Sequence, residues 1–292
     1  MDGQHIEEVT LQKANFIGIG AQKCASTWLY GALAQFPDVY VSDRKEVDFF
    51  SYFYDHGYEW YERHFAEGAQ RRFRGEVSPS YFISSDAPQR AHLYNRDLLI
   101  LVTLRDPVER AYSNHLHEVR AGHLSGANLV FETAIENNPL YLNQGRYAHH
   151  LQRWFATFPR EQIHVTFQED VKADSLAQTR RLAAFMGTRE PEQFVRRSAN
   201  ESVDYKNRAV GMMLWRLGKR ARKAGLGAVV EQVKTLPGIR QMRSANQKSL
   251  RDATAPMRPE TEAALVRSFE EDVRALESLL GTQVPWKRFR AS

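Results

Sequence analysis

The chain has 292 residues, of which 42% are hydrophobic and 26% charged, so it can bury a substantial core and is not a wholly disordered protein. Its net charge of +5 and pI of about 9.2 favour an anionic partner such as a phosphate, a sulfate, an acidic sugar, a nucleic acid or a membrane surface. Its one cysteine, Cys24, excludes an intramolecular disulfide and is typical of a reducing compartment.

Two stretches bear on where the protein acts. The N-terminal segment MDGQHIEEVTLQKANF has no basic stretch followed by an apolar core, so it predicts no signal peptide. The longest apolar run, LLILVTL at residues 98–104, is far too short to span a bilayer. We therefore expect a cytoplasmic protein.

The first predicted elements are a strand over residues 15–20 and a helix over 26–36, joined by a short turn. A helix start offers unpaired backbone N–H groups and the positive end of the helix dipole, so this arrangement favours anion binding. Lys23 adds a full charge, and Ser26 and Thr27 add hydroxyl donors. Alternatively, the hydroxyls only cap the helix and the lysine is solvated. The turn lacks the Gly-Lys-Ser/Thr sequence of a Walker A loop.

The strongest predicted strand is residues 98–104, which are apolar on both faces as in a central parallel strand. Arg105 follows directly, and ligands of open parallel sheets bind beyond the carboxyl ends of the strands. The planar guanidinium of arginine suits a phosphate, and Ser113 lies in the helix that follows. The alternative is that Arg105 and Asp106 form a local ion pair that caps this helix.

Further along the chain, IHVTF at residues 163–167 predicts a strand, and residues 178–187 and 259–281 predict amphipathic helices. Strands that alternate with helices predict an α/β fold with a parallel sheet flanked by helices. We expect one domain over residues 1–292, with a basic helical insertion or lid at about 200–252.

These stretches resemble a known family. QKCASTWL and LLILVTLRDPVERAYSNH resemble the two nucleotide-binding signatures of the sulfotransferases that use 3′-phosphoadenosine 5′-phosphosulfate (PAPS). KEVDFF, GEVSPSYF, NQGRYAHHLQRWFATFP with IHVTFQED, and VRALESLLGTQVPW resemble segments of the heparan-sulfate and Golgi-type branch. The resemblance covers about residues 14–195 and 258–288 and indicates a bacterial, cytosolic member of that branch.

The resemblance implies a P-loop-like fold and transfer of a sulfuryl group from PAPS to a hydroxyl or an amine, leaving adenosine 3′,5′-bisphosphate (PAP) and needing no metal. Carried over by position, the residues that hold the 5′-phosphosulfate are Lys23, Ala25, Ser26, Thr27 and Trp28. Arg105 and Ser113 would hold the 3′-phosphate, and Tyr147 would help to seat the nucleotide.

The catalytic residues implied by the resemblance are Lys23 and one of two glutamates. A lysine near the departing phosphate oxygen stabilises the charge that develops there. A general base belongs on the opposite side of the transferred group, and Glu46 and Glu76 both occupy positions where the family often has it. We favour Glu46, because the loop expected to face the acceptor carries it. The alternative is that either glutamate only pairs with Lys23 or Arg44, or caps a turn.

Several positions depart from the family pattern. Asp48 replaces the histidine of the KE-x-HFF segment, and Val77 replaces the lysine of the E-K-[ST]-P segment. Loss of that lysine implies an acceptor less anionic than heparan sulfate, or a cation supplied from elsewhere. The loop that contacts the 3′-phosphate in relatives is missing, and Lys248 and Arg251 are the candidate replacements.

The segment 206–251 is strongly basic, with twelve Lys or Arg residues against one acid, Glu231. Three interpretations stay open: a lid that gathers an anionic acceptor, a helix that docks peripherally on acidic lipid, or a solvated basic face packed on the core. Nucleic acid is not expected as a partner, because no recognised module accompanies the charge. The sequence does not indicate an oligomeric state.

Two rival functions differ from sulfuryl transfer. A P-loop kinase would require a Walker A sequence and a carboxylate for Mg²⁺, and a non-catalytic binder of anionic ligands could dispense with both candidate bases. The acceptor could be a small molecule, a glycan or a lipid. The aromatic segment 49–65 would suit an aromatic or lipidic acceptor, although such clusters usually form core.

Overall fold

The computed structural model describes residues 11–191, 193–194, 203–205, 247–249 and 255–290. Most of the basic segment 206–251, Arg251 included, lies outside the described residues, so all three interpretations of it stay predictions. The chain divides into two compact units; the first contains Met1–Asn114, Asn138–Asn200 and Pro259–Ser292, and the second contains His115–Asn137 and Glu201–Arg258. The expected single domain with an insertion at about 200–252 likewise stays a prediction.

The first unit is built on a five-stranded sheet in the order β2-β3-β1-β4-β5. Its strands are β1 (Phe16–Gly20), β2 (Val39–Val41), β3 (Phe73–Val77), β4 (Leu99–Leu104) and β5 (Ile163–Phe167). All neighbouring pairs are parallel, which confirms the predicted α/β fold.

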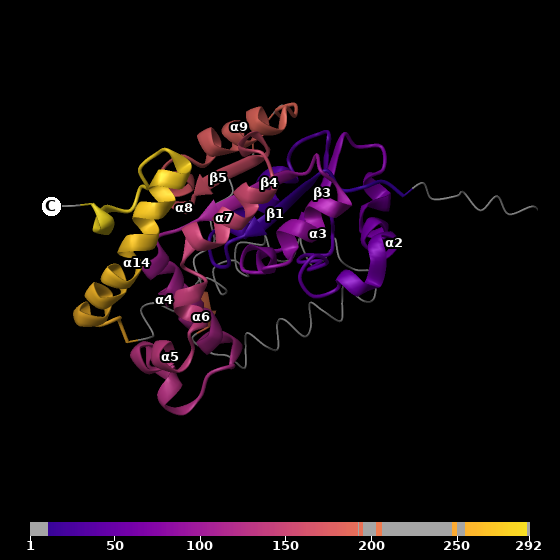
Figure 1. Cartoon of the computed structure of the whole chain (residues 1–292). Helices are drawn as coiled ribbons and strands as arrows, with labels where there is room; N and C mark the ends of the chain where they lie inside the picture. Colours follow the sequence, from indigo (N-terminus) through magenta and orange to yellow (C-terminus); the bar gives the residue numbers. More distant parts are fainter. Residues whose placement is uncertain (1–10, 192, 195–202, 206–246, 250–254, 291–292) are drawn as a thin grey trace, which may run out of the picture. The chain divides into compact units, whose positions relative to one another are not determined.

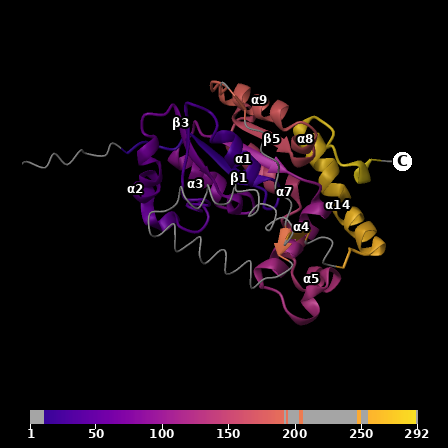
Figure 2. The same ribbon diagram turned by 180° about the vertical axis from the view of Figure 1, so that it is seen from behind.

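The helices of this unit follow the strands. They are α1 (Ser26–Leu33), α2 (Gly57–Glu62), α3 (Ala87–Tyr94), α4 (Pro107–Ala121), α6 (Leu140–Asn143), α7 (Tyr147–Thr157), α8 (Gln168–Ala173), α9 (Ser175–Met186) and α14 (Pro259–Leu280); α4 belongs to this unit as far as Asn114. Figure 1 shows α3 and α7 on one face of the sheet, and Figure 2 shows α1 on the opposite face.

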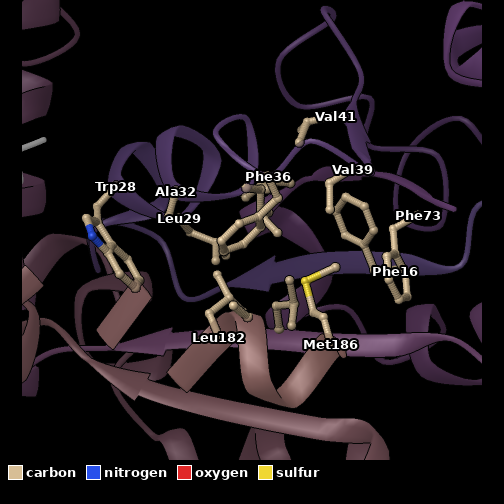
Figure 3. Packing of buried hydrophobic residues seen from close by; sticks show 14 of the residues in the cluster. Phe16, Trp28, Leu29, Ala32, Phe36, Val39, Val41, Phe73, Leu182 and Met186 are labelled. Atoms are coloured by element: carbon tan, nitrogen blue, oxygen red, sulfur yellow. The ribbon is translucent and has the colours of Figure 1, made fainter. Parts of the chain in front are cut away.

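An apolar layer fixes α1 on the sheet. Trp28 and Leu29 of α1 meet Leu182 and Met186 of α9 over the apolar side chains of the sheet (Figure 3). Full burial of each such side chain stabilises the fold by roughly 1.5–3 kcal/mol. The turn before α1 is therefore held between a buried strand and an anchored helix.

Close approach of β1 and β3 depends on a glycine. A Cβ built on Gly75 would lie 2.0 Å from the carbonyl oxygen of Phe16, its partner in the parallel register. No side chain fits there, so the pairing that aligns the carboxyl ends of these strands requires glycine at this position.

The aromatic segment 49–65 is mainly core. The rings of Phe49 and Tyr61 stack at 4.5 Å between centroids, and Phe50 meets Tyr61 edge-on at 5.1 Å. All three residues are fully buried, so they do not offer an acceptor surface. Tyr52 and Tyr58 of the same segment are exposed, by 67% and 38%.

The second unit contains α5 (Phe131–Asn137) and a two-stranded antiparallel sheet of β6 (Val203–Tyr205) and β7 (Gln247–Ser249). His115 is fully buried there; its Nε2 lies 3.1 Å from the Leu129 carbonyl, and burial lowers its pKa. His115 is thus held by its surroundings, as expected for a structural histidine.

Candidate active site

Three loops meet at one edge of the sheet. Because β3, β1 and β4 are neighbours and parallel, the segments that follow their carboxyl ends lie side by side. The segment after β1 carries Lys23, the segment after β3 carries Ser78 and Ser80, and the segment after β4 carries Arg105. This edge is where ligands bind in open α/β sheets.

The turn between β1 and α1 presents backbone donors. Lys23 and Ala25 adopt left-handed conformations, with φ of 67° and 70°, which non-glycine residues rarely adopt. Within the described residues, the N–H groups of Ala25, Ser26 and Thr27 donate to no protein acceptor. Together with the charge of Lys23, these donors fit an anion such as a phosphosulfate.

Trp28 has a different role from the one that the resemblance implies. Its backbone N–H donates to the Ala25 carbonyl at 2.9 Å, and its indole Nε1 donates to Ser175 Oγ at 3.1 Å. The side chain is 2% exposed. Both donors are therefore used within the protein, which favours a packing role that fixes α1 over contact with a nucleotide.

The sequence Arg105-Asp106-Pro107 forms the start of α4. Asp106 Oδ1 accepts from the backbone N–H groups of Val108 and Glu109 at 2.9 and 3.1 Å, which is an N-cap with proline in the first turn. Burial raises the pKa of the Asp106 carboxyl to about 6, although Arg288 opposes the shift.

The alternative ion pair between Arg105 and Asp106 is not the one that forms. Arg105 Nη2 lies 3.1 Å from Glu109 Oε2, and Asp106 pairs instead with Arg288 at 2.8 Å. Arg288 also contacts Glu109 at 3.3 Å. Since Arg105 is only 12% exposed, its guanidinium is held in place by Glu109 and remains a candidate for binding a phosphate.

The spacing of Arg105 and Ser113 has a geometric reason. Residues four apart on a helix share one face, and Glu109 lies four residues from each of them. The ion pair between Arg105 and Glu109 places the guanidinium on that face, and Ser113 lies half-buried one turn further along α4. The two predicted 3′-phosphate ligands therefore project from the same side of α4.

Tyr147 connects the two halves of this site. Its hydroxyl donates to the Arg105 carbonyl at 2.8 Å and lies 3.5 Å from Cys24 Sγ in the turn after β1. The residue is fully buried, and burial raises the pKa of the Cys24 thiol to about 11, so this thiol stays protonated. Tyr147 supports the shape of the site from within and does not need to touch the nucleotide.

Glu46 lines a cavity beside the turn. The cavity has a volume of about 150 Å³, and its walls are Gln22, Glu46, Asp48, Tyr52, Pro79, Ser80, Ile83 and Gln144. Glu46 and Asp48 both have left-handed backbones, with φ of 60° and 57°. This twisted loop places the carboxylates of two alternate residues beside Gln22, which precedes Lys23.

Glu76 is close to this loop but lies in the interior. It is 1% exposed and accepts a hydrogen bond from Ser78 Oγ at 2.5 Å, while the backbone N–H of Asp48 donates to the same Ser78 hydroxyl at 2.9 Å. Burial raises the pKa of Glu76 to about 7, opposed by the hydroxyl of Ser78. The two candidate bases thus differ in their surroundings. Glu46 lines a cavity, whereas Glu76 is buried and has a pKa near neutrality.

We expect Glu76→Gln to change how stability depends on pH. Below pH about 4.5 the Glu76 carboxyl is protonated in both states; between about 4.5 and 7 only the unfolded chain loses the proton, so the free energy of unfolding falls as pH rises. Above pH 7 the buried Glu76 carboxylate lowers the free energy of unfolding by its full amount, on the order of 3 kcal/mol. Urea unfolding across this range should show a steeper fall in the wild type than in the variant, in which only other buried carboxyls such as Asp106 still contribute.

The matched control for this experiment is Glu161→Gln, because Glu161 is exposed. Its stability should follow the wild-type pH curve. Parallel curves for the wild type and Glu76→Gln would mean that Glu76 titrates normally and is not desolvated.

Sequence reasoning missed several residues of the cavity. Gln22 and Ser80 flank recognised motifs but carry no signal of their own. Gln144 lies two residues before Arg146 in the segment that resembles the family's G-x-Y motif. Asp48 was noted only as a departure, yet it lines the cavity and accepts from Ser80 Oγ at 2.5 Å. Val77, the other departure, packs in the apolar layer below α1.

Within the part of the chain that the structure describes, no group of three or more His, Cys, Asp or Glu residues could hold a metal ion. Among the same residues, no helix is both long and apolar enough to cross a membrane.

The fold is that of an α/β protein whose candidate anion site lies at the carboxyl ends of its central strands. The Sulfotransferase domain family matches residues 14–209, more than half of the chain, and the chain belongs to this family.

Relatives and solved structures agree with this assignment. Heparan sulfate glucosamine 3-O-sulfotransferase 3A1 of Mus musculus is 29% identical over 188 residues, which are 62% of this chain and 48% of the relative. The bifunctional heparan sulfate N-deacetylase/N-sulfotransferase of Drosophila melanogaster is 28% identical over 201 residues, covering 59% of this chain and 19% of the relative. The chain thus matches less than half the length of these relatives.

A solved sulfotransferase from Alicyclobacillus acidocaldarius has the same fold. It superposes with a TM-score of 0.66 at 24% sequence identity, over 94% of this chain and 98% of that chain.

Proposed function

We propose that the protein is an enzyme, a sulfotransferase that moves the sulfuryl group of PAPS to a hydroxyl, or an amine, of its acceptor. The observation that carries the proposal is the convergence of three parts: the donor-rich turn with Lys23, the Arg105 face of α4, and the cavity that holds Glu46. Tyr147 links the first two, and Gln22 brings the cavity beside the turn.

Each part has a chemical task in this reaction. When bound, PAPS supplies the sulfuryl group. The N–H groups of Ala25, Ser26 and Thr27 and the charge of Lys23 hold the phosphosulfate and stabilise the negative charge that develops on the departing phosphate oxygen. Arg105 and Ser113 orient the other end through the 3′-phosphate.

The proton of the acceptor needs a base. As the acceptor oxygen forms its bond to sulfur, the bond between sulfur and the phosphate oxygen breaks, PAP leaves, and the acceptor proton passes to a carboxylate. Glu46 is our preferred base, because it lines the cavity whereas Glu76 is 1% exposed and bonded to Ser78.

The acceptor we propose is a small molecule or a glycan. The names of two relatives state that they act on heparan sulfate, and the cavity beside Glu46 has room for the reacting hydroxyl of an acceptor. Action in the cytoplasm is part of the proposal, and the single cysteine, Cys24, is typical of a reducing compartment.

The test of the proposed function is the binding of PAP. Titration calorimetry should show PAP binding to the wild type, with no comparable binding of ATP–Mg²⁺. Arg105→Ala should weaken PAP binding about 10-fold to 100-fold, since charged hydrogen bonds to the 3′-phosphate are lost. Glu109→Gln should weaken it less, because Arg105 keeps its charge and loses only the carboxylate that holds its guanidinium in place.

These paired variants make the outcome decisive. Binding of ATP–Mg²⁺ alone would favour a kinase and end the proposal. Equal PAP affinity in Arg105→Ala and in the wild type would remove Arg105 from the 3′-phosphate site.

A further inference from the structure

A second cavity adjoins the one that contains Glu46. It has a volume of about 380 Å³ and is lined by Ile83, Leu140, Asn143, Gln144, Arg146, His149, His150 and Arg153. Ile83 and Gln144 also line the first cavity, so the two spaces share a wall. The second volume falls within the range of small-molecule sites.

The two cavities have opposite charge. The first contains the carboxylates of Glu46 and Asp48 and no basic side chain. The second contains the guanidinium groups of Arg146 and Arg153 and no carboxylate. An acceptor that reaches both would place a neutral hydroxyl in the acidic cavity and an anionic group in the basic one, because the reverse orientation sets like charges together.

Arg153 is held in place for such a contact. Its Nη2 lies 2.8 Å from His150 Nδ1 and donates to the Ile83 carbonyl at 3.2 Å. His150 Nε2 lies 2.7 Å from the Asn143 carbonyl, which fixes the tautomer with the proton on Nε2 and leaves Nδ1 as an acceptor. Within the described residues, Nη1 of Arg153 donates to no protein group.

Burial keeps the His150 ring neutral. Burial, with the nearby charge of Arg153, lowers the pKa of His150 to about 4. His150 is therefore neutral near pH 7 and can accept the hydrogen bond from Arg153 without adding charge of its own.

Arg146 is the less restrained of the two arginines. It is half-buried, and its side chain makes no hydrogen bond or ion pair within the described residues. Asp272 of α14 lies behind this wall, but its carboxylate accepts from the backbone N–H groups of Ala148 and His149 at 3.0 and 3.2 Å. Asp272 therefore offsets the positive charge in part while its oxygens stay bonded to the backbone.

Gln144 is oriented at the shared wall. Its Oε1 accepts from Nη1 of the fully buried Arg110 at 2.9 Å. Because a guanidinium only donates, the amide oxygen must face Arg110, and the NH₂ group is the end left for a ligand in either cavity. The wall between the cavities thus offers a donor suited to an acceptor oxygen.

Each cavity also has an exposed, largely apolar side chain in its lining. Tyr52 on the first is 67% exposed and Leu140 on the second is 47% exposed, and Ile83 lies between them. Exposed apolar side chains at a pocket commonly bind the apolar part of a ligand.

We propose that the basic cavity is the subsite for an anionic group of the acceptor, so that the preferred acceptor is an amphiphilic hydroxy compound with a carboxylate or sulfate remote from its reacting hydroxyl. This inference rests on the proposed function, since the cavity is assigned to the acceptor of sulfuryl transfer.

The test compares two probes that differ in charge. Fluorine NMR measures the binding of para-trifluoromethylbenzoate and of its neutral amide, para-trifluoromethylbenzamide, to the protein saturated with PAP. We expect the benzoate to bind about 5-fold to 10-fold more tightly in the wild type, as a charged hydrogen bond exceeds a neutral one. Arg146→Gln and Arg153→Gln should each abolish this preference.

Arg146→Lys and Arg274→Gln are the matched controls. Arg146→Lys keeps the charge and should keep part of the preference, and Arg274→Gln changes an arginine that is 74% exposed on α14 and should keep all of it. Equal or absent binding of the two probes by the wild type with PAP bound would overturn the inference, as would a preference that survives Arg146→Gln. Failure of the wild type to bind PAP would instead overturn the proposed function.

Discussion

Replacing Lys23 with alanine is expected to lower the rate of sulfuryl transfer by a factor of about 10²–10³. The charge of Lys23 acts mainly on the phosphate oxygen that becomes negative as the sulfuryl group departs, so the loss should appear in kcat more than in the affinity for PAP. Transfer of radiolabelled sulfur from PAPS to the best acceptor in a panel of phenols, sugars and hydroxy lipids measures the rate. Calorimetry measures the affinity.

Lys172→Ala is the matched control, because Lys172 is an exposed lysine of α8. It should retain wild-type turnover. If Lys23→Ala also retains it, Lys23 has no part in the chemical step, and the backbone donors of the turn alone must stabilise the leaving group.

The second large effect is expected for Glu46→Gln. Loss of the proton acceptor should lower kcat by a factor of about 10²–10⁴, while PAP binds as in the wild type because Glu46 is not among the proposed nucleotide ligands. The same labelled-sulfur assay gives the rate, and calorimetry with PAP verifies that the donor site is intact.

Asp48→Asn and Glu76→Gln identify the base by comparison. Asp48 lines the same cavity but is bonded to Ser80, so its variant should lose far less activity than Glu46→Gln. If Glu76→Gln shows the greatest loss of activity, Glu76 is the general base. Its pKa near neutrality would then explain how it accepts the proton.

The sequence was sufficient for the fold because its strongest patterns have local causes. The apolar run 98–104, the proline after Asp106 and the small-residue turn before Ser26 each act over a few residues. The parallel sheet also predicts that the loops after β1, β3 and β4 are adjacent, since the carboxyl ends of parallel strands meet at one edge.

Side-chain partners were harder to predict. The choice of Arg105 between Asp106 and Glu109 depends on helix geometry and on Arg288, which lies about 180 residues away in the sequence. The indole N–H of Trp28 finds its acceptor in Ser175, which is 147 residues away in the sequence. Such contacts come from tertiary packing, which a single sequence read along its length does not contain.

The acceptor side was the least predictable part. The second cavity combines Ile83 with residues from the range 140–153. His150 in this cavity is neutral because the fold buries it and lowers its pKa. The sequence supports the general expectation of a cation supplied from elsewhere, but nothing in it singles out Arg146 or Arg153.

The contacts of Trp286 and Arg288 have a consequence for biosynthesis. Glu169 accepts from the Trp286 indole and from the backbone N–H of Asp106, and Arg288 pairs with Asp106 and Glu109. During translation the corner proposed to bind phosphate therefore lacks part of its framework until residue 288 has left the ribosome. Nascent chains should acquire affinity for nucleotide only once residue 288 has emerged, well after the sheet itself has formed.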